Sequence, residues 1–362
     1  MSVTVLYERL LLHPADLTQL SPDFEVVGVF NPGVVRYKDD VLFLVRVVEQ
    51  PRIKSKQELF SPRAIWPSGK LEWTLDSFPS KDADTSDPRL FYLPDGRVRL
   101  RFISHLRLVR MNANCSQVKD IRVVPDLLPS EEWEEFGIED ARITRIGDTY
   151  YITYVAISST MGIATALMTT RDFHNFQRRG IIFPTENKDV VLLPEIWQGS
   201  YVAYHRPVSN YRINLPSIET SLSPDATHWG SHQYLLGPCM EGWNSVKVGA
   251  GPPPLRVPEG WLLIFHEVSP ADSESPVGRY CVGAALLDGE NPLRLLARST
   301  IPLLCPERLY EKRGFAPNIL FPTGALLSED EDSLLLFSGA ADEVVSMLRI
   351  PIKSVIDHLE AI

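Results

Sequence analysis

The sequence predicts an all-β protein built as a β-propeller, and three observations support this fold class. Hairpin patterns, each with an apolar run, a polar turn and a second apolar run, recur along the 362 residues. Sustained helical periodicity is scarce, and the 29 prolines favour loops over helices. The second strands of the hairpins recur about every 50 to 70 residues, which is close to the size of one four-stranded blade.

Six segments show the hairpin pattern, and most of their turns contain Asp-Gly, Gly-Asp, Gln-Gly or Glu-Gly pairs, which tolerate a tight reversal. The first is VVRYKDDVLFLVRV from Val34, and the last is ALLSEDEDSLLLFSGA from Ala325. Six hairpins leave both five and six blades open. The remaining four segments begin at Arg89, Arg142, Val191 and Pro254.

The segments between the hairpins have weaker patterns. GIATALMTT from Gly162 is typical of an outer strand, which is less buried and therefore less regular. Residues 50–88 are polar and irregular, so we expect a long insertion there, near a blade edge. Residues 352–362 are expected to form a short terminal helix. Because no low-complexity stretch marks a boundary, residues 1–362 are predicted to form a single propeller domain.

Two further fold classes fit the pattern less well. A doubly wound α/β sheet needs helices between its strands, and the sequence does not predict them. A β-sandwich stays open as an alternative, but its turns should recur every 8 to 12 residues without a longer period.

Composition and charge restrict the partners and the compartment. The formal charge of −10 argues against a nucleic-acid partner, whereas a neutral substrate or a small anion is compatible with it. The cysteines Cys115, Cys239, Cys281 and Cys305 lack metal-binding spacing, so we expect buried free thiols in a reducing compartment. The N-terminal segment does not resemble a signal peptide, and no apolar run reaches about 18 residues, so we expect a cytoplasmic protein without a membrane span.

Polar residues beside the apolar strands are the candidates for a functional site. Inner strands of a propeller converge on its axis, so polar residues at their ends can meet in one pocket. Each residue alone is more simply a turn residue or an ion-pair partner, but burying so many acids and bases without a function would be costly. The candidates are Asn31, Arg46, Glu49, Asp87, Arg89, Glu139, Asp140, Arg142, Lys188, Asp189, Glu195, His205, Arg206, Lys247, His266, Glu267, Asn318 and Asp342.

These residue types suggest glycosyl transfer, in which an acid protonates the leaving oxygen and a nucleophile attacks from the opposite face. Glu139 and Asp140 are adjacent and should point to opposite faces of a strand, so only one is expected in the pocket. Some aromatic residues could stack on sugar rings, although Trp261 is more simply a core residue. The aromatic candidates are Trp243, Trp261, Tyr204 and Tyr211.

A set of basic residues could bind an anion. Lys188, Arg206 and His266 offer fixed donors of the kind that suit tetrahedral oxyanions such as phosphate. Alternatively, Arg206 could form an ion pair with Asp189 or Glu195. No cluster of His, Asp and Glu has ligand spacing, so no metal site is expected, and no cofactor is expected other than phosphate as a co-substrate.

Four motifs resemble those of glycoside hydrolase family 130, the β-mannoside phosphorylases and mannosidases. They are GIEDARITRIGDTYYITY, ENKDVVLLPE, YHRP and VGAGPPPLRVPEGWLLIFHE, and they occur in order and at suitable spacing. The resemblance extends from Phe30 to Asp342 and therefore covers most of the chain.

The resemblance implies a five-bladed propeller and an inverting reaction. The family's acid falls on Asp140 and acts through a hydroxyl of the bound mannose. Phosphate attacks the anomeric carbon and gives α-mannose 1-phosphate. The phosphate-binding residues match Lys188, Arg206 and His266, and the mannose-binding residues match Asn31 and Asp342. We extend the expected sugar-binding set by Arg46, Asp87, Arg89, Glu139, Arg142 and Glu195.

The chain departs from the family pattern at three places, one of which is the long insertion before Asp87. Ala141 replaces a proline of the usual E-D-P-R motif, and Phe265-His266-Glu267 replaces the usual Tyr-His-Gly. A carboxylate at Glu267, beside a phosphate ligand, would repel phosphate or could activate a water molecule.

The leading hypothesis is therefore an inverting phosphorylase acting on mannobiose, mannosyl-glucose or short manno-oligosaccharides. The second hypothesis is a hydrolase of the same family, with Glu195, Glu241 or Glu267 activating water. The third is a non-catalytic propeller that binds sugar or protein, and the fourth is a five-bladed glycosidase of the furanosidase type. The resemblance is also compatible with a homo-oligomer.

Overall fold

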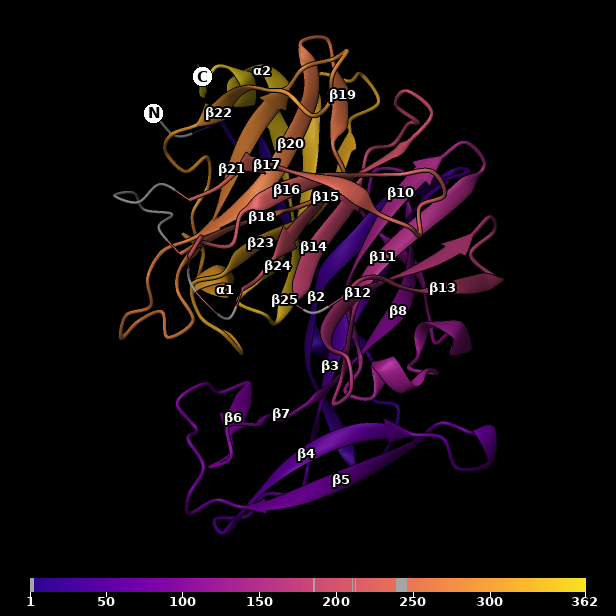
Figure 1. Ribbon diagram of the computed structural model, residues 1–362, viewed down its shortest axis with the longest axis vertical. Helices are drawn as coiled ribbons and strands as arrows, with labels where there is room; N and C mark the ends of the chain where they lie inside the picture. The colour runs from indigo at the N-terminus through magenta and orange to yellow at the C-terminus, as the bar shows by residue number, and fades with distance from the viewer. Residues whose placement is uncertain (1–2, 185, 210, 212, 239–245) are drawn as a thin grey trace.

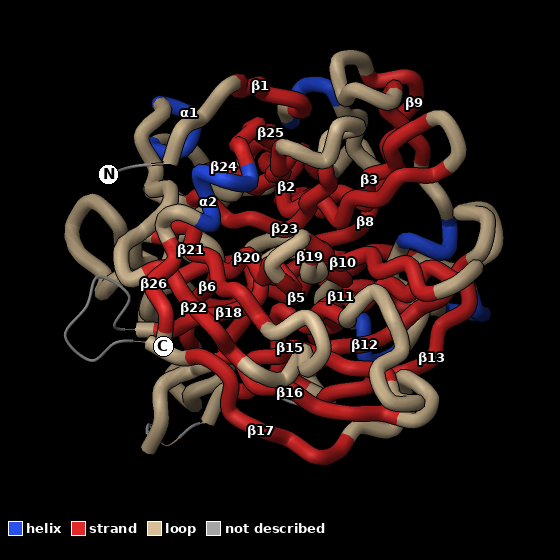
Figure 2. The backbone as a smooth tube through the Cα atoms, turned by 90° about the horizontal axis from the view of Figure 1, so that it is seen from above, coloured by secondary structure: helices blue, strands red, loops and turns tan. Residues whose placement is uncertain are grey.

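The computed structural model describes residues 3–184, 186–209, 211, 213–238 and 246–362, and most of its regular structure is β-strand. Five antiparallel sheets surround one axis (Figure 2), which confirms the five-bladed propeller. No helix in the described part of the chain is long and apolar enough to cross a membrane. The helical segments are α1 (Leu309–Lys312), α2 (Ile352–Ile356) and 3-10 turns at Pro14–Asp16, Pro67–Gly69, Pro125–Leu127 and Glu132–Glu134.

The first strand of each blade lies next to the axis, because β2 contacts β10 and β23, and β14 contacts β10 and β18. Blade one contains β2 (Phe24–Tyr37), β3 (Asp40–Pro51), β8 (Ile103–Asn112) and β9 (Val118–Arg122). Blade two contains β10 (Ile138–Ile146), β11 (Thr149–Ser158), β12 (Gly162–Thr170) and β13 (Phe176–Phe183). Blade three contains β14 (Asn187–Leu192), β15 (Tyr201–Pro207), β16 (Ile218–Ser223) and β17 (Gly230–Leu236).

The last two blades join the two ends of the chain to the ring. Blade four contains β18 (Lys247–Ala250), β19 (Leu255–Val257), β20 (Gly260–Val268), β21 (Tyr280–Leu287), β22 (Leu295–Ser299) and β26 (Leu359–Ala361). Blade five contains β23 (Leu320–Leu327), β24 (Ser333–Ala340), β25 (Val344–Pro351) and the N-terminal strand β1 (Tyr7–Leu12). The pairing of β1 with β25 closes the ring. The expected terminal helix is wrong beyond Ile356, because β26 pairs with β22 instead.

Two hairpins between β3 and β8 project from blade one (Figure 1). They are β4 (Glu58–Ile65) with β5 (Glu72–Pro79), and β6 (Leu90–Tyr92) with β7 (Val98–Leu100). The expectation that residues 50–88 are irregular is therefore wrong, because β4 and β5 pair along their whole length. Their residues are mostly half-buried, which weakens the apolar alternation. The hairpin predicted from Arg89 is β6–β7, so six hairpin patterns produce only five blades.

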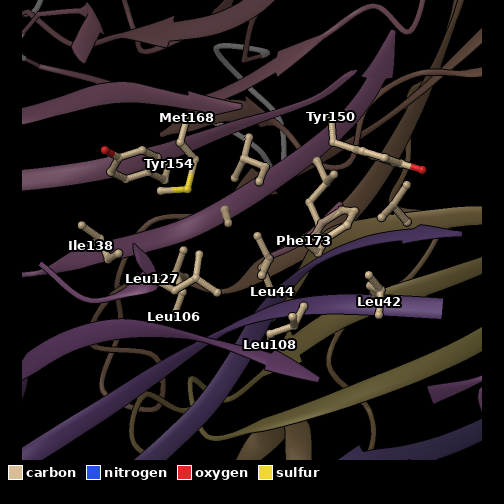
Figure 3. Packing of buried hydrophobic residues seen from close by; sticks show 14 of the residues in the cluster. Leu42, Leu44, Leu106, Leu108, Leu127, Ile138, Tyr150, Tyr154, Met168 and Phe173 are labelled. Carbon is tan, nitrogen blue, oxygen red and sulfur yellow. The ribbon is translucent and has the colours of Figure 1, made fainter. Parts of the chain in front are cut away.

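The hydrophobic core consists of clusters between neighbouring blades. Figure 3 shows the cluster between blades one and two, where Leu44 and Leu106 pack against Ile138 and Met168. Ala141, at the position of the family's proline, is buried in the same cluster. Burying each large aliphatic side chain contributes about 1.5–3 kcal/mol, so these interfaces hold the blades in a fixed arrangement around the axis.

The cysteines differ from the expectation of free thiols. Cys281 on β21 forms a disulfide bond with Cys305, 24 residues later in the sequence. The sequence spacing hides this proximity, which follows from a β-bridge between Val282 and Leu304. Cys115 is a buried free thiol, and burial raises its pKa to about 11. Cys239 lies outside the described residues.

Candidate active site

Three inner strands share a local distortion. The register of β2, β10 and β14 against the next strand shifts around Asn31, Asp140 and Asp189, respectively. All three residues have a left-handed backbone, with φ angles of 47°, 52° and 56°. Asn and Asp tolerate this conformation better than other side chains with a Cβ. Because a β-bulge re-aims side chains, the distortion directs these three polar residues into the same axial region.

The bulges line an axial cavity of about 190 Å³. A neighbouring cleft of about 410 Å³ shares Arg46, Arg89, Lys188 and Asp342 with it as lining residues. The full lining of the axial cavity is Asn31, Arg46, Arg89, Asp140, Glu186, Lys188, Asp189, Arg206, Lys247, His266, Tyr280, Ile319, Phe321 and Asp342. Most of the sequence candidates are therefore brought together.

Asp140 is held by groups from two blades. Asn31 Nδ2 donates to its Oδ1 at 2.8 Å, and Arg46 Nη1 lies 3.2 Å from the same oxygen. Arg142 Nη1 donates a hydrogen bond to the backbone carbonyl of Asp140 at 2.7 Å. Arg46 Nη2 also contacts Glu139 Oε1 at 2.6 Å. Asp140 lines the axial cavity and Glu139 lines the neighbouring cleft, so only one of these adjacent carboxylates lies in the axial cavity, as expected, although one guanidinium contacts both.

A further carboxyl group, Asp342, lines the cavity close to these charges. Burial raises the pKa of Asp342, and the carboxylates of Asp140 and Glu139 act in the same direction, although Arg89 and Arg46 oppose the shift. The cavity therefore contains a carboxyl group that holds its proton to a higher pH than usual.

Asp87 lies behind Arg89 and lines neither cavity. Its carboxylate accepts hydrogen bonds from Arg89 Nε at 3.0 Å and from Arg89 Nη2 at 2.9 Å. Arg89 in turn lies 3.9 Å from Asp342 Oδ2. Of this predicted sugar-binding pair, Arg89 lines the cavity and Asp87 orients it. Arg142 is likewise buried beneath the cavity lining.

The basic residues gather around the buried Asp189 carboxylate. Arg206 Nη1 lies 3.0 Å from Asp189 Oδ2, His266 Nε2 lies 3.6 Å from the same oxygen, and Arg142 Nη2 lies 3.8 Å from Oδ1. Burial alone would raise the pKa of Asp189, but Arg206 and its other cationic neighbours lower it overall. The pairing of Arg206 with Asp189, which the sequence left open, is therefore observed. Since several cationic groups share this one carboxylate, Lys188 among them, the region stays positively charged.

His266 and Tyr280 form the wall of this basic region. Burial lowers the pKa of His266 to about 3, so the imidazole is neutral at physiological pH. Its ring stacks on Tyr280 at 5.8 Å, and the Lys247 ammonium lies 5.0 Å from the Tyr280 ring centroid. Burial alone would raise the pKa of Tyr280, but Lys247 and two arginines lower it overall. A region that lowers the pKa of a buried phenol also favours an anionic ligand.

Sequence reasoning missed some of the cavity lining. Tyr280 opens β21, the third full strand of its blade, whereas the candidates were sought beside the first two strands. Glu186 and Phe321 also line the cavity and were not among the candidates, although Glu186 lies only two residues before Lys188.

Some candidates lie outside the axial cavity. Glu195 is exposed in the turn after β14, at the end of that strand away from Lys188, so its expected sugar contact is corrected. Glu267 is buried and forms an ion pair with Arg298 at 2.8 Å. It follows His266 on β20, and strand alternation directs it away from the cavity. Glu241 falls outside the described residues.

The proposed stacking aromatics are not found at the cavity either. Trp261 and Tyr204 belong to the core between blades three and four, and Tyr211 is 80% exposed. Trp243 falls outside the described residues. The neighbouring cleft contains the aromatic surface instead, with contributions from the inserted hairpin β6–β7. Its apolar lining includes Phe30, Leu90, Val98, Leu100, Phe102, Phe136, Ile157, Ile163 and Phe315.

Comparisons with known proteins identify the family of this chain. The model of the family Glyco_hydro_130, described as beta-1,4-mannooligosaccharide phosphorylase, matches residues 111–361. A beta-1,2-mannobiose phosphorylase of Listeria innocua is 37% identical over 98% of this chain and 97% of its own. A 1,2-beta-oligomannan phosphorylase of Thermoanaerobacter is 33% identical over 64% of this chain and 74% of its own.

Solved structures show the same relationship. The structure of the Listeria innocua beta-1,2-mannobiose phosphorylase in complex with beta-1,2-mannobiose matches 96% of each chain, with a TM-score of 0.87 and 36% identity. A structure from work on family members that hydrolyse beta-1,2 mannosidic linkages in Candida mannan has a TM-score of 0.67 at 19% identity, over 90% of this chain and 85% of its own, and shows the fold alone. The chain therefore belongs to glycoside hydrolase family 130.

Proposed function

We propose that this protein is an inverting phosphorylase that cleaves a β-mannoside with inorganic phosphate. The observation that supports it most is the position of Lys188, Arg206 and His266 in the same 190 Å³ cavity as Asp140. Fixed cationic and neutral donors around a small cavity are the arrangement that binds a tetrahedral oxyanion. Because the Listeria innocua relative, 37% identical over 98% of this chain, is a beta-1,2-mannobiose phosphorylase, this disaccharide is the first substrate to test.

In the proposed reaction, a phosphate oxygen attacks the anomeric carbon of the bound mannosyl unit. The bond from that carbon to the bridging oxygen breaks, and the leaving sugar receives a proton that originates from Asp140 and passes through a mannose hydroxyl. The attack comes from the face opposite the leaving group, so the β-mannoside gives α-mannose 1-phosphate and a free sugar.

The contacts of Asp140 suit this role. Its side-chain hydrogen bonds from Asn31 and Arg46 both end on Oδ1. We assign the transferred proton to Oδ2, because Oδ1 already accepts from two donors. Asp342 and Asn31 line the cavity beside Asp140 and are assigned to the mannosyl unit, together with Arg46, Arg89 and Glu139.

The neighbouring cleft is assigned to the leaving sugar. It shares four lining residues with the axial cavity, and its aromatic and aliphatic surface suits the apolar face of a sugar ring. Because β6 and β7 contribute to it, the insertion in blade one takes part in acceptor recognition. We also propose that residues 1–362 act as one catalytic domain and that the protein works in the cytoplasm.

Hydrolysis is the second candidate function, and one observation supports testing for it. Glu186 lines the axial cavity and could activate a water molecule in place of phosphate. The carboxylates first considered for this role are less suitable, since Glu195 is exposed and Glu267 pairs with Arg298.

The test is incubation of the protein with β-1,2-mannobiose and β-1,4-mannobiose, with and without inorganic phosphate, followed by identification of the products. Phosphorolysis predicts cleavage that requires phosphate and yields α-mannose 1-phosphate. Equal release of free mannose without phosphate would establish hydrolysis instead. No cleavage of either disaccharide, with binding of both, would favour a non-catalytic propeller.

A further inference from the structure

Blade three carries a second cluster of titratable side chains, separate from the axial cavity. His205 on β15, Glu219 on β16 and His232 on β17 each offer one ligand atom, and these atoms lie within 4.8 Å of one another. His205 pairs with Glu219, and Glu219 pairs with Tyr234, two residues after His232. Strand alternation therefore places all three side chains on one face of the sheet, opposite to that of Arg206.

The two imidazoles already have the spacing of metal ligands. His205 Nε2 and His232 Nδ1 lie 3.3 Å apart. Two nitrogen ligands, each about 2.0–2.1 Å from a tetrahedral zinc ion, are about 3.3–3.4 Å apart. To complete the site, only the Glu219 carboxylate has to move toward the two imidazoles. Among the described residues, no hydrogen bond or ion pair holds this carboxylate elsewhere.

A buried amide next to His205 supports a ligand role. Asn187 Nδ2 lies 2.9 Å from His205 Nδ1, and the amide oxygen of Asn187 is buried without a hydrogen-bond partner. Rotating the amide by half a turn lets this oxygen accept a hydrogen bond from Nδ1–H. The Nε2 lone pair is then directed at His232 and Glu219. Metal-binding histidines are typically oriented by such a hydrogen bond on their second nitrogen.

The cluster lies against packed aromatic rings on one side and is accessible to solvent on the other. His205 is buried and stacks on Phe183 at 4.4 Å, and Phe183 stacks on Trp229 at 5.4 Å. His232 is exposed, and Glu219 is half-buried. One ligand is thus fixed before binding, and the remaining two can be reached by an ion from outside.

We propose that His205, Glu219 and His232 bind one divalent transition-metal ion of the zinc type. Two imidazole nitrogens with one carboxylate match the ligand preferences of zinc, whereas magnesium and calcium prefer ligand sets made of oxygen. Bound there, the ion links three adjacent strands of blade three, including the edge strand β17. The site is independent of the proposed phosphorolysis.

The test uses untagged protein that has been treated with a chelator and dialysed. Cobalt(II) is added stepwise, and its visible absorption is recorded. The proposal predicts one equivalent bound per chain with the absorption of a four- or five-coordinate ion, displacement by one equivalent of zinc, and a higher melting temperature with zinc. Uptake below one equivalent, or the weak spectrum of a fully hydrated ion, would overturn it.

Two variants locate the binding. His232→Ala removes an exposed ligand, so the fold should survive, and stoichiometric cobalt binding and the zinc-dependent melting shift should be lost. His228→Ala is the matched control, because His228 is an exposed histidine of the same blade that pairs with Asp225 and lies outside the cluster. This control should bind cobalt like the unaltered chain. Equal binding by His232→Ala and the unaltered chain would place the ion elsewhere and refute the site.

Discussion

Replacing Asp189 with asparagine tests whether this carboxylate organises the phosphate site. Asparagine preserves the shape but removes the charge that Arg206 faces at 3.0 Å and His266 at 3.6 Å. The Asp189 side chain is 4% exposed, and removing one partner of a buried ion pair costs about 3–5 kcal/mol. For a chain of this length we expect the melting temperature to fall by roughly 3–10 °C, since larger proteins shift less per kcal/mol.

Phosphate should restore part of that stability, because the anion supplies the negative charge that the variant lacks. The assay is thermal unfolding of both proteins with and without saturating phosphate. The phosphate-induced rise in melting temperature should be larger for Asp189→Asn than for the unaltered chain. The exposed Asp225 serves as the control, and its change to asparagine should alter neither value appreciably. An unchanged melting temperature for Asp189→Asn, or a smaller response to phosphate, would refute the reasoning.

Three further changes separate the roles of neighbouring groups. Glu267→Gln should lower the melting temperature, because Arg298 loses a buried partner at 2.8 Å, but should leave the phosphate requirement of cleavage intact. Arg46→Lys should lower kcat by roughly 10- to 100-fold at an unchanged KM for phosphate, since lysine cannot bridge Glu139 and Asp140 as the guanidinium does. Buried His266, with a folded pKa of about 3, should make stability fall by about 1.4 kcal/mol per pH unit as the pH drops from about 6 toward 3, because the unfolded chain binds a proton there that the folded chain does not. Urea unfolding across this range should show a slope smaller by this amount for His266→Gln than for the unaltered chain.

The fold was predictable because the first two strands of every blade are largely buried. Their apolar runs and turn residues are a local signal that survives in a single sequence. The β4–β5 hairpin was missed for the opposite reason, since its half-buried strands have no strong apolar alternation. The count of blades was ambiguous because β6–β7 has the hairpin pattern without belonging to a blade.

The site was only partly predictable because strand ends are visible in the sequence and bulges are not. The cavity lies at the beginning of the inner strands and at the end of the second strands, which is why residues from both positions, such as Asp140 and Arg206, line it. The prediction for Glu195 was wrong because this residue follows the end of β14 that lies away from the cavity. The shared contact of Glu139 and Asp140 with Arg46 could not be predicted, because it depends on the bulge at Asp140. The cluster around His205 was overlooked because its ligands come from three strands with no short spacing.

The central claim is that Asp140 supplies the proton for phosphorolysis in the axial cavity. The most direct test is the rate of α-mannose 1-phosphate formation from β-1,2-mannobiose, measured for the unaltered chain and for Asp140→Asn at saturating phosphate. We expect the variant to lose about 10²- to 10⁴-fold in kcat, because the amide cannot donate the proton as the carboxyl group does, while phosphate still raises its melting temperature. Formation of α-mannose 1-phosphate by Asp140→Asn at the unaltered rate would contradict the account.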